Sequence, residues 1–166
     1  MNSRDEQLRR QIEDAFSDVP RPEKRRVAYA RGAWETPKLV RDFGGRHWKD
    51  VPIDKVRDHA AHLSLFSPEA LAYYLPAYLS AALVDLDVRD FLLSSLTISD
   101  EAQPDLRAFF LRRFDRLSLP QRNAIRMFLI HMRDASNSPI SKQSWSQALE
   151  MYWEAGNRES DEKTPR

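Results

Sequence analysis

The chain has 166 residues and a formal net charge of +1, with 42% hydrophobic and 31% charged residues, which is typical of one soluble globular domain. It has no cysteine, which excludes a disulfide framework, a thiol nucleophile and a cysteine-based zinc site. Four glycines and no sustained alternation of apolar and polar residues argue against a β-rich fold. The first residues contain no apolar stretch of the kind found in secretion signals, so we expect a cytoplasmic protein.

Apolar residues recur at helical spacing along most of the chain, and turn-forming residues separate the stretches. The pattern predicts an all-α fold, a single compact domain of seven or eight short helices over residues 1–156, and a disordered tail over residues 157–166. In chain order the predicted helices cover residues 3–19, 36–43, 54–63, 67–84, 88–96, 104–117, 118–132 and 141–154.

The stretch 67–84 is the most apolar in the chain and contains a single charged residue, Glu69. Ser67 is a good N-cap and Pro68 suits the first helical position, so a helix is predicted to begin here. Pro76 lies inside the pattern and predicts either a kink or two shorter helices that meet there. The run is too short for a membrane span, which needs about 20 apolar residues, so we expect the buried central helix of the domain.

Charge is unevenly distributed, because residues 51–105 carry a net charge of −6 between two basic flanks. An acidic surface there would attract a basic partner. The candidate partner-binding residues are Asp85, Asp87, Asp90, Asp100, Glu101 and Asp105. The basic segment 21–31 is interleaved with aromatic residues and is either a phosphate-contacting arm or a solvated loop that shields the acidic middle. Nucleic-acid binding is the less favoured interpretation, because no nucleic-acid motif accompanies the segment.

The sharpest chemical pattern is formed by Asp58, His59 and His62. If residues 54–63 form one helix, the two histidines lie three positions apart and share a face, which also carries the carboxylate. Such a set suits a divalent metal or acid–base chemistry. A metal site needs further ligands and no second motif supplies them, so we predict no metal and no cofactor. The simpler interpretation is a histidine pair on a partly exposed helix face.

Three tyrosines, Tyr73, Tyr74 and Tyr78, lie next to the proline of the central stretch. They either line a pocket as acid–base groups or, as we favour, pack in the core with each hydroxyl hydrogen-bonded at its edge. A solvated helix face is predicted for Arg112, Arg113 and Arg116. The chain has no G-x-S-x-G motif, no glycine-rich phosphate loop and no H-E-x-x-H motif, which argues against an enzyme.

Four blocks resemble a family of small uncharacterised bacterial helical proteins, a domain of unknown function. The most specific is S-P-E-A-x-x-Y-Y-L-P-A-Y-L, which spans residues 67–79. The other three are residues 12–22, residues 43–48 and residues 119–129. Their order and spacing cover the chain from about residue 12 to residue 130. The resemblance implies one soluble bacterial domain, but it implies no established activity and carries over no catalytic residue.

These observations favour a protein–protein interaction module without enzymatic activity. One form of it is an immunity-type protein that neutralises a toxin. Two alternatives stay open: a metal-dependent or acid–base enzyme that uses His59 and His62, and a nucleic-acid-associated protein that uses residues 21–31. No membrane association is expected.

Overall fold

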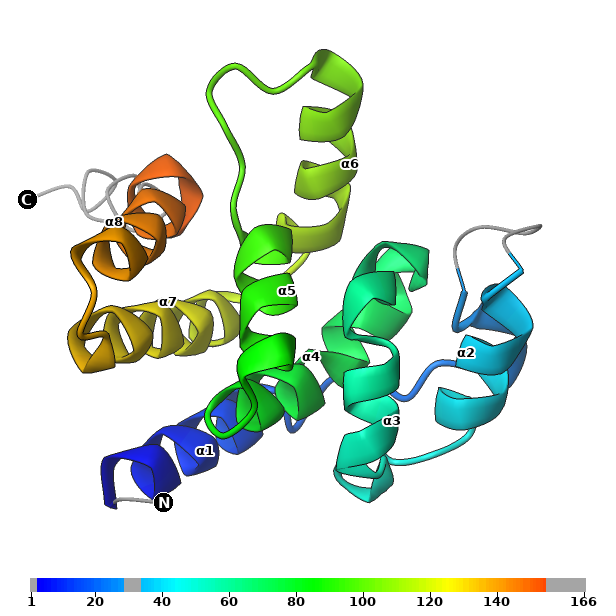
Figure 1. The fold of residues 1–166 in the computed structure, drawn as a ribbon. Helices are drawn as coiled ribbons and strands as arrows, with labels where there is room; N and C mark the ends of the chain where they lie inside the picture. The colour runs from blue at the N-terminus through cyan, green and yellow to red at the C-terminus, as the bar shows by residue number, and fades with distance from the viewer. Residues whose placement is uncertain (1–2, 29–33, 155–166) are drawn as a thin grey trace, which may run out of the picture.

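The computed structural model describes residues 3–28 and 34–154, and within these residues the chain is all-α, as the sequence predicted. One isolated antiparallel β-bridge joins Ala28 to Phe66. The α-helices are α1 (Ser3–Ala15), α2 (Thr36–Phe43), α3 (Ile53–Asp58), α4 (Pro68–Ala82), α5 (Leu86–Leu96), α6 (Pro104–Phe114), α7 (Leu119–Ala135) and α8 (Pro139–Ala148) (Figure 1). The short 3₁₀-helices η1 (Lys24–Arg26), η2 (Trp48–Asp50) and η3 (Ala60–Leu65) and the π-helical turn η4 (Leu149–Trp153) complete the described secondary structure.

Helix α4 is the central element of the fold, as its apolar sequence predicted. Twelve of its fifteen residues are buried, so the helix is covered all round rather than along one stripe. It contacts α1, α3, α5, α6 and η2, and Figure 1 shows α5 crossing in front of it. Pro76 lies inside this single helix. The alternative of two shorter helices that meet at the proline is therefore wrong.

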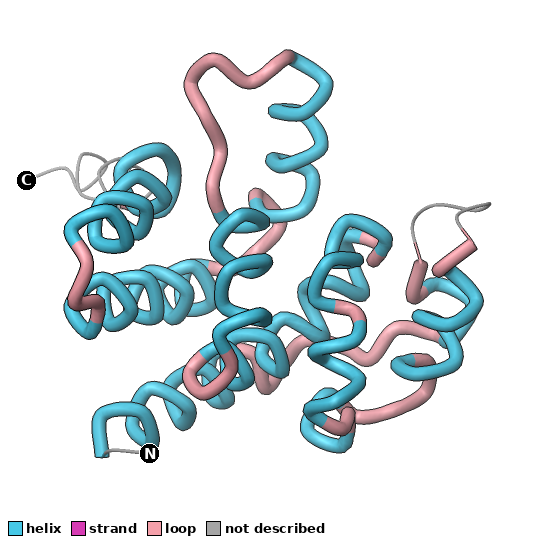
Figure 2. The backbone as a smooth tube through the Cα atoms, in the orientation of Figure 1, coloured by secondary structure: helices cyan, strands magenta, loops and turns pink. Residues whose placement is uncertain are grey.

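Helices from the two ends of the chain pack together on one side of α4. Helix α1 contacts α7, and α7 in turn contacts α8 and η4. Helices α2 and α3 lie on the opposite side of the molecule, and α6, which follows the long loop after α5, packs against α4 (Figure 2). The domain is therefore a single compact body with α4 at its centre.

Side chains at the start of three helices accept backbone N–H groups that the first turn leaves unpaired. The Ser67 hydroxyl accepts one of these groups in α4 at 3.0 Å. Ser118 and Gln121 form a reciprocal capping box at the start of α7. The Asp85 carboxylate caps α5, which consequently begins at Leu86, two residues earlier than predicted.

The predicted helix over residues 54–63 is wrong beyond Asp58, where α3 ends. His59 follows with φ −106° and ψ 13°, which is not helical geometry, and η3 begins after it. The imidazole of His59 is fully buried and lies 2.9 Å from the carboxylate of Asp42 in α2. The break in the helix thus turns this imidazole into the core instead of placing it along a helix face.

Helix α2 ends at the glycine pair that the sequence singled out. The Gly44 N–H donates to the Val40 carbonyl at 2.8 Å, and Gly45 adopts a φ of +79° that side chains rarely tolerate. A Cβ atom on Gly44 would lie 2.5 Å from both the Lys24 side chain and the Val40 carbonyl oxygen. The close approach of η1 therefore requires glycine at this position.

Within residues 3–28 and 34–154, no helix combines the length and the apolar character needed to cross a membrane. The tail predicted over residues 157–166 lies outside the described residues, as do Tyr29 and Arg31 of the basic segment.

Candidate functional site

Asp85 differs from the other carboxylates of the predicted acidic surface, because it is buried and bonded to other parts of the chain. Its side chain is 8% exposed, accepts the Val88 N–H at 3.1 Å and accepts from Arg57 Nε at 2.6 Å. The bond from Val88, assisted by Arg57, lowers the pKa of Asp85 against the opposing effect of burial. This residue caps α5 and holds α3 against the turn between α4 and α5, so it faces another part of the chain rather than solvent.

The other five carboxylates are exposed and form no ion pair with any residue that the structure describes: Asp87, Asp90, Asp100, Glu101 and Asp105. Arginines around these carboxylates bind other groups: Arg107 donates to the backbone carbonyls of Ser99 and Asp100. Arg89 donates to the carbonyls of Ala82 and Leu83, and Arg57 is bound to Asp85. None of the five therefore has an ion-pair partner among the described residues, although the charge of Arg57 also attracts Asp87.

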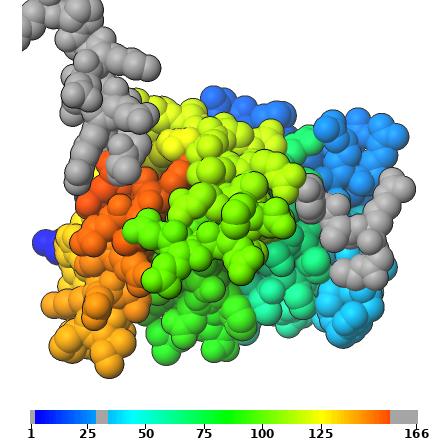
Figure 3. Space-filling view, turned by 90° about the horizontal axis from the view of Figure 1, so that it is seen from above, coloured from blue at the N-terminus to red at the C-terminus, as the bar shows by residue number. Residues whose placement is uncertain are grey.

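Exposed apolar side chains accompany these carboxylates. Leu86 is 67% exposed and Phe91 is 46% exposed on the outer side of α5, and Leu106 is 62% exposed in the first turn of α6. The starts of α5 and α6 lie at opposite ends of this part of the molecule (Figure 1). Seen from above, α5, the loop of residues 97–103 and α6 form a continuous part of the surface (Figure 3). We refer to the exposed residues of α5, this loop and the first turn of α6 as the α5–α6 surface.

The histidine pattern is only partly assembled. His59 Nδ1 lies 3.4 Å from His62 Nδ1, but Asp58 bonds Lys55 instead of joining them. The carboxylate beside His59 is Asp42, which the spacing of residues did not reveal because it comes from α2. No group of three or more potential metal ligands occurs in the part of the chain that the structure describes. The cluster is a hydrogen-bonded chain of Asp42, His59 and the partly exposed His62, and His59 itself is fully buried.

The three tyrosines pack in the core with their hydroxyls paired, as we favoured. Tyr74 donates to the Phe43 carbonyl at 2.6 Å, and Tyr78 donates to the His59 carbonyl at 3.3 Å. The Tyr73 hydroxyl lies 3.3 Å from Nε of Arg21, which donates to it. Burial raises the pKa of Tyr74 to about 12 and that of Tyr78 well above its ordinary value. Neither hydroxyl is therefore poised for acid–base chemistry at neutral pH.

The described arginines of the basic segment contact acceptors within the protein. Arg21 also donates to the Gly45 carbonyl at 3.0 Å, Arg25 pairs with Glu23, and Arg26 pairs with Glu69 at the start of α4. The last pair joins the basic segment to one carboxylate of the acidic middle of the chain.

The prediction of a solvated face is wrong for Arg113. Its side chain is 5% exposed, donates to the Leu63 carbonyl and lies against the rings of Phe109 and Phe114. Burial lowers the pKa of Arg113 to about 10. Because its position in α6 faces η3, the residue links these two elements. The other two arginines of the predicted face, at positions 112 and 116, are exposed.

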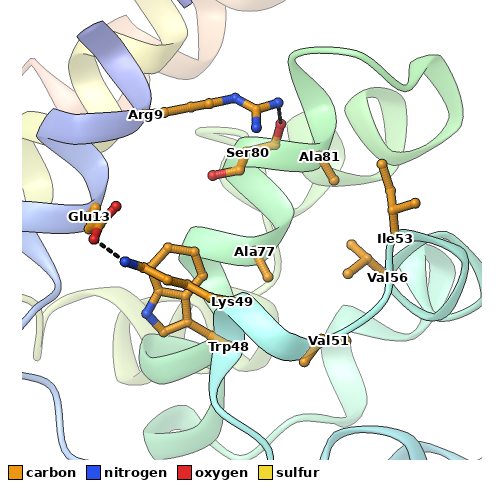
Figure 4. A pocket seen from close by; sticks show the side chains of 10 residues that line it. All are labelled: Arg9, Glu13, Trp48, Lys49, Val51, Ile53, Val56, Ala77, Ser80 and Ala81. Atoms are coloured by element: carbon orange, nitrogen blue, oxygen red, sulfur yellow. Dashed lines mark hydrogen bonds and ion pairs between the residues drawn. The ribbon is translucent and has the colours of Figure 1, made fainter. Parts of the chain in front are cut away.

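A cavity of about 320 Å³, which the sequence did not predict, lies between α1, η2, α3 and α4 (Figure 4). Its apolar wall comes from side chains of η2, α3, α4 and the segments between them, and its polar wall comes mainly from α1. The lining residues are Arg9, Glu13, Trp48, Lys49, Val51, Ile53, Val56, Ala77, Ser80 and Ala81. Cavities of this size are at the lower end of the range that small-molecule sites occupy.

The polar wall contains three charged groups. Arg9 and Glu13 are four positions apart in α1, a spacing that would allow them to pair with each other. Glu13 instead forms an ion pair with Lys49 of η2. Arg9 donates from one terminal nitrogen to the Ser80 carbonyl at 3.1 Å, and its Nε is buried without a hydrogen-bond partner. The four-residue spacing in α1 was the available signal for this site, but no pattern in the sequence indicates that Lys49 of η2 pairs with Glu13.

The comparisons with known proteins agree with the resemblance seen in the sequence. The chain belongs to a family of unknown function (DUF6714), whose family model matches residues 4–157. No curated protein and no solved structure matches the chain. Membership of this family assigns no activity, so inferences about function rest on the geometry described above.

Proposed function

We propose that this protein is a non-enzymatic interaction module that binds a basic protein partner through the α5–α6 surface. The observation that carries the proposal is the set of five exposed carboxylates that have no ion-pair partner within residues 3–28 and 34–154 and lie beside exposed apolar side chains. An exposed carboxylate alone is ordinary. Next to Asp90 and Asp105, the exposed side chains of Phe91 and Leu106 provide apolar area that a partner could bury, with the carboxylates at its rim.

The charge of the surface indicates the chemistry of the partner. Unneutralised carboxylates attract lysine- and arginine-rich surfaces and speed their association, whereas the apolar residues supply area that is buried on contact. The partner should therefore carry basic residues around an apolar patch. An immunity-type protein that binds and neutralises a toxin is the specific form of this proposal that we put forward.

Charge-reversed variants test the proposal. Wild-type protein and the double variant Asp87→Lys/Asp90→Lys are used to capture partners from a lysate of the organism that encodes the chain, at low and at moderate salt. The control variant Asp14→Lys/Glu150→Lys has the same net charge, because it replaces two exposed acidic residues that lie outside the α5–α6 surface. Thermal melts establish that all three proteins are folded.

The partner is then purified and its binding measured directly. We expect a basic protein whose affinity for the Asp87→Lys/Asp90→Lys variant falls at least about tenfold, with slower association and a weaker dependence on salt. The control should bind as the wild type does. A partner that binds both variants equally, or a partner without basic character, contradicts the proposal. A gel shift with DNA or RNA at low salt separates this outcome from nucleic-acid binding, which is strongest there.

A further inference from the structure

The charge of Arg9 faces a cavity and has no carboxylate partner among the described residues. Lys49, across the cavity, is paired with Glu13 and lies 5.6 Å above the ring of Trp48. With one carboxylate and two cations, the polar wall keeps one positive charge, and that charge is on Arg9. An anion is the complement of this wall.

The orientation of Arg9 suits a ligand. One terminal nitrogen is fixed by the Ser80 carbonyl at 3.1 Å, whereas the other points into the space above Ala77 and Trp48 (Figure 4). The Ser80 side chain extends from the same side of α4 towards Glu13. A guanidinium that is held at one nitrogen and free at the other is already oriented for an oxyanion, so little rotamer entropy is lost on binding.

The opposite side of the cavity is apolar. Val51, Ile53 and Val56 line it from the start of α3, and Ala77 and Ala81 form its floor on α4. The indole of Trp48 provides a flat wall next to the polar groups (Figure 4). Ala77 and Ala81 have small side chains, so they leave the space above α4 open.

We infer that this cavity binds a small organic carboxylate with a compact apolar or aromatic body. Its carboxylate accepts hydrogen bonds from Arg9, and its body lies between Trp48 and the apolar wall. A cavity of about 320 Å³ lies at the lower end of the range for small-molecule sites, so we expect a small, compact ligand. The site is separate from the α5–α6 surface, and the inference does not depend on the proposed protein partner.

Phenylacetate is a suitable probe, because it combines a carboxylate with a phenyl ring and is of about the right size. Phenethyl alcohol retains the ring without the charge, and acetate retains the charge without the ring. Titration of each into isotopically labelled protein, followed by NMR, reports on the amides of Ala77, Ser80 and Ala81 and on the indole N–H of Trp48. We expect phenylacetate to shift these signals at lower concentration than either of the other two.

Three variants locate the contact. In Arg9→Gln, the affinity for phenylacetate should fall at least about tenfold, to the level of phenethyl alcohol, whose own affinity should not change. In the matched control Arg10→Gln, which alters an exposed arginine of the same helix, both affinities should stay as in the wild type. In Ala77→Leu, the added side chain fills the cavity and both ligands should lose affinity.

The inference is overturned if phenylacetate leaves the cavity signals unshifted up to its solubility limit, or if it binds elsewhere. It is also overturned if phenethyl alcohol binds as well as phenylacetate, or if Arg9→Gln leaves the affinity for phenylacetate unchanged. If Arg9→Gln does not fold, the affinities of the three ligands for the wild type and for Ala77→Leu still test whether the cavity binds a carboxylate with an apolar body.

Discussion

The bond between Asp42 and His59 should make a measurable contribution to stability, and Asp42→Asn isolates it. The two side chains are 6% and 0% exposed and lie 2.9 Å apart, so the bond is shielded from water. Burial alone would raise the pKa of Asp42, but hydrogen bonds from His59 and Arg41 outweigh it and lower the pKa below its ordinary value of 3.8. A hydrogen bond to a charged group contributes about 1.5–3 kcal/mol and a neutral one about 0.5–1.5 kcal/mol.

An asparagine oxygen still accepts from His59, so Asp42→Asn removes only the difference between a charged and a neutral hydrogen bond. We expect the free energy of unfolding to fall by about 1–2 kcal/mol at neutral pH. The stabilisation from a carboxylate with a lowered pKa is fully present above pH 3.8 and is lost as the pH falls through the folded-state value. The difference in the free energy of unfolding between the wild type and Asp42→Asn should therefore become smaller at acid pH.

Urea unfolding followed by circular dichroism, repeated from neutral pH down to the lowest pH at which both proteins fold, measures this gap. Arg41→Gln is the control, because its side chain is 68% exposed and its ion pair with Asp42 should contribute less than about 1 kcal/mol. A variant within a few tenths of a kcal/mol of wild type, or a deficit that does not change with pH, would refute the reasoning.

Three further substitutions test how the fold is held together, each by urea unfolding. Leu75→Ala truncates a side chain that is 1% exposed at the centre of α4, and should cost about 2–5 kcal/mol; a loss well under 1 kcal/mol would show that α4 is not central. Tyr74→Phe removes the hydroxyl that donates to the Phe43 carbonyl, which still accepts from the Arg46 N–H, and should cost about 0.5–1.5 kcal/mol; an unchanged stability would show that the hydroxyl bond contributes nothing. Ser118→Ala removes the cap of α7 and should cost about 1 kcal/mol, whereas Ser118→Asp should retain most of the stability because aspartate also caps.

The elements that the sequence predicted best are those with a local cause. The helix at residues 68–82 follows from its cap, its first proline and its apolar run, and α7 follows from the Ser118–Gln121 capping box. The errors have causes that act at a distance. His59 leaves the helix because a carboxylate 17 residues earlier in the chain receives it in the core, and no spacing within residues 54–63 encodes that contact.

The candidate sites divide in the same way. Exposure of the acidic residues on α5 was predictable from helical periodicity, but the commitment of Asp85 to Arg57 depends on how α3 packs. The cavity beside Arg9 combines residues from α1, η2, α3 and α4, and the Glu13–Lys49 ion pair that lines it joins two of these elements. Sites assembled from several elements in this way leave no motif in the sequence.

Two arginines, Arg9 and Arg113, have an Nε atom that is buried without a partner, and the difference between them supports the assignment of the ligand site. Arg113 is enclosed: it is 5% exposed, a carbonyl accepts from its guanidinium, and aromatic rings lie against it. Interactions with ring faces and a carbonyl dipole are the compensation available to a buried cation that has no anion. Such an arginine joins η3 to α6 and has no room for a ligand.

Arg9 is only partly buried and has neither a ring face nor a carboxylate among the contacts described for it. Beyond its free nitrogen lies a cavity instead of packed side chains. A cation in this position is compensated by solvent in the free protein and by an anion in a complex, and the apolar wall opposite favours an anion that carries a hydrophobic body. A buried Nε without a hydrogen-bond partner therefore belongs to a structural contact in Arg113 of α6, but to a ligand-binding contact in Arg9 of α1.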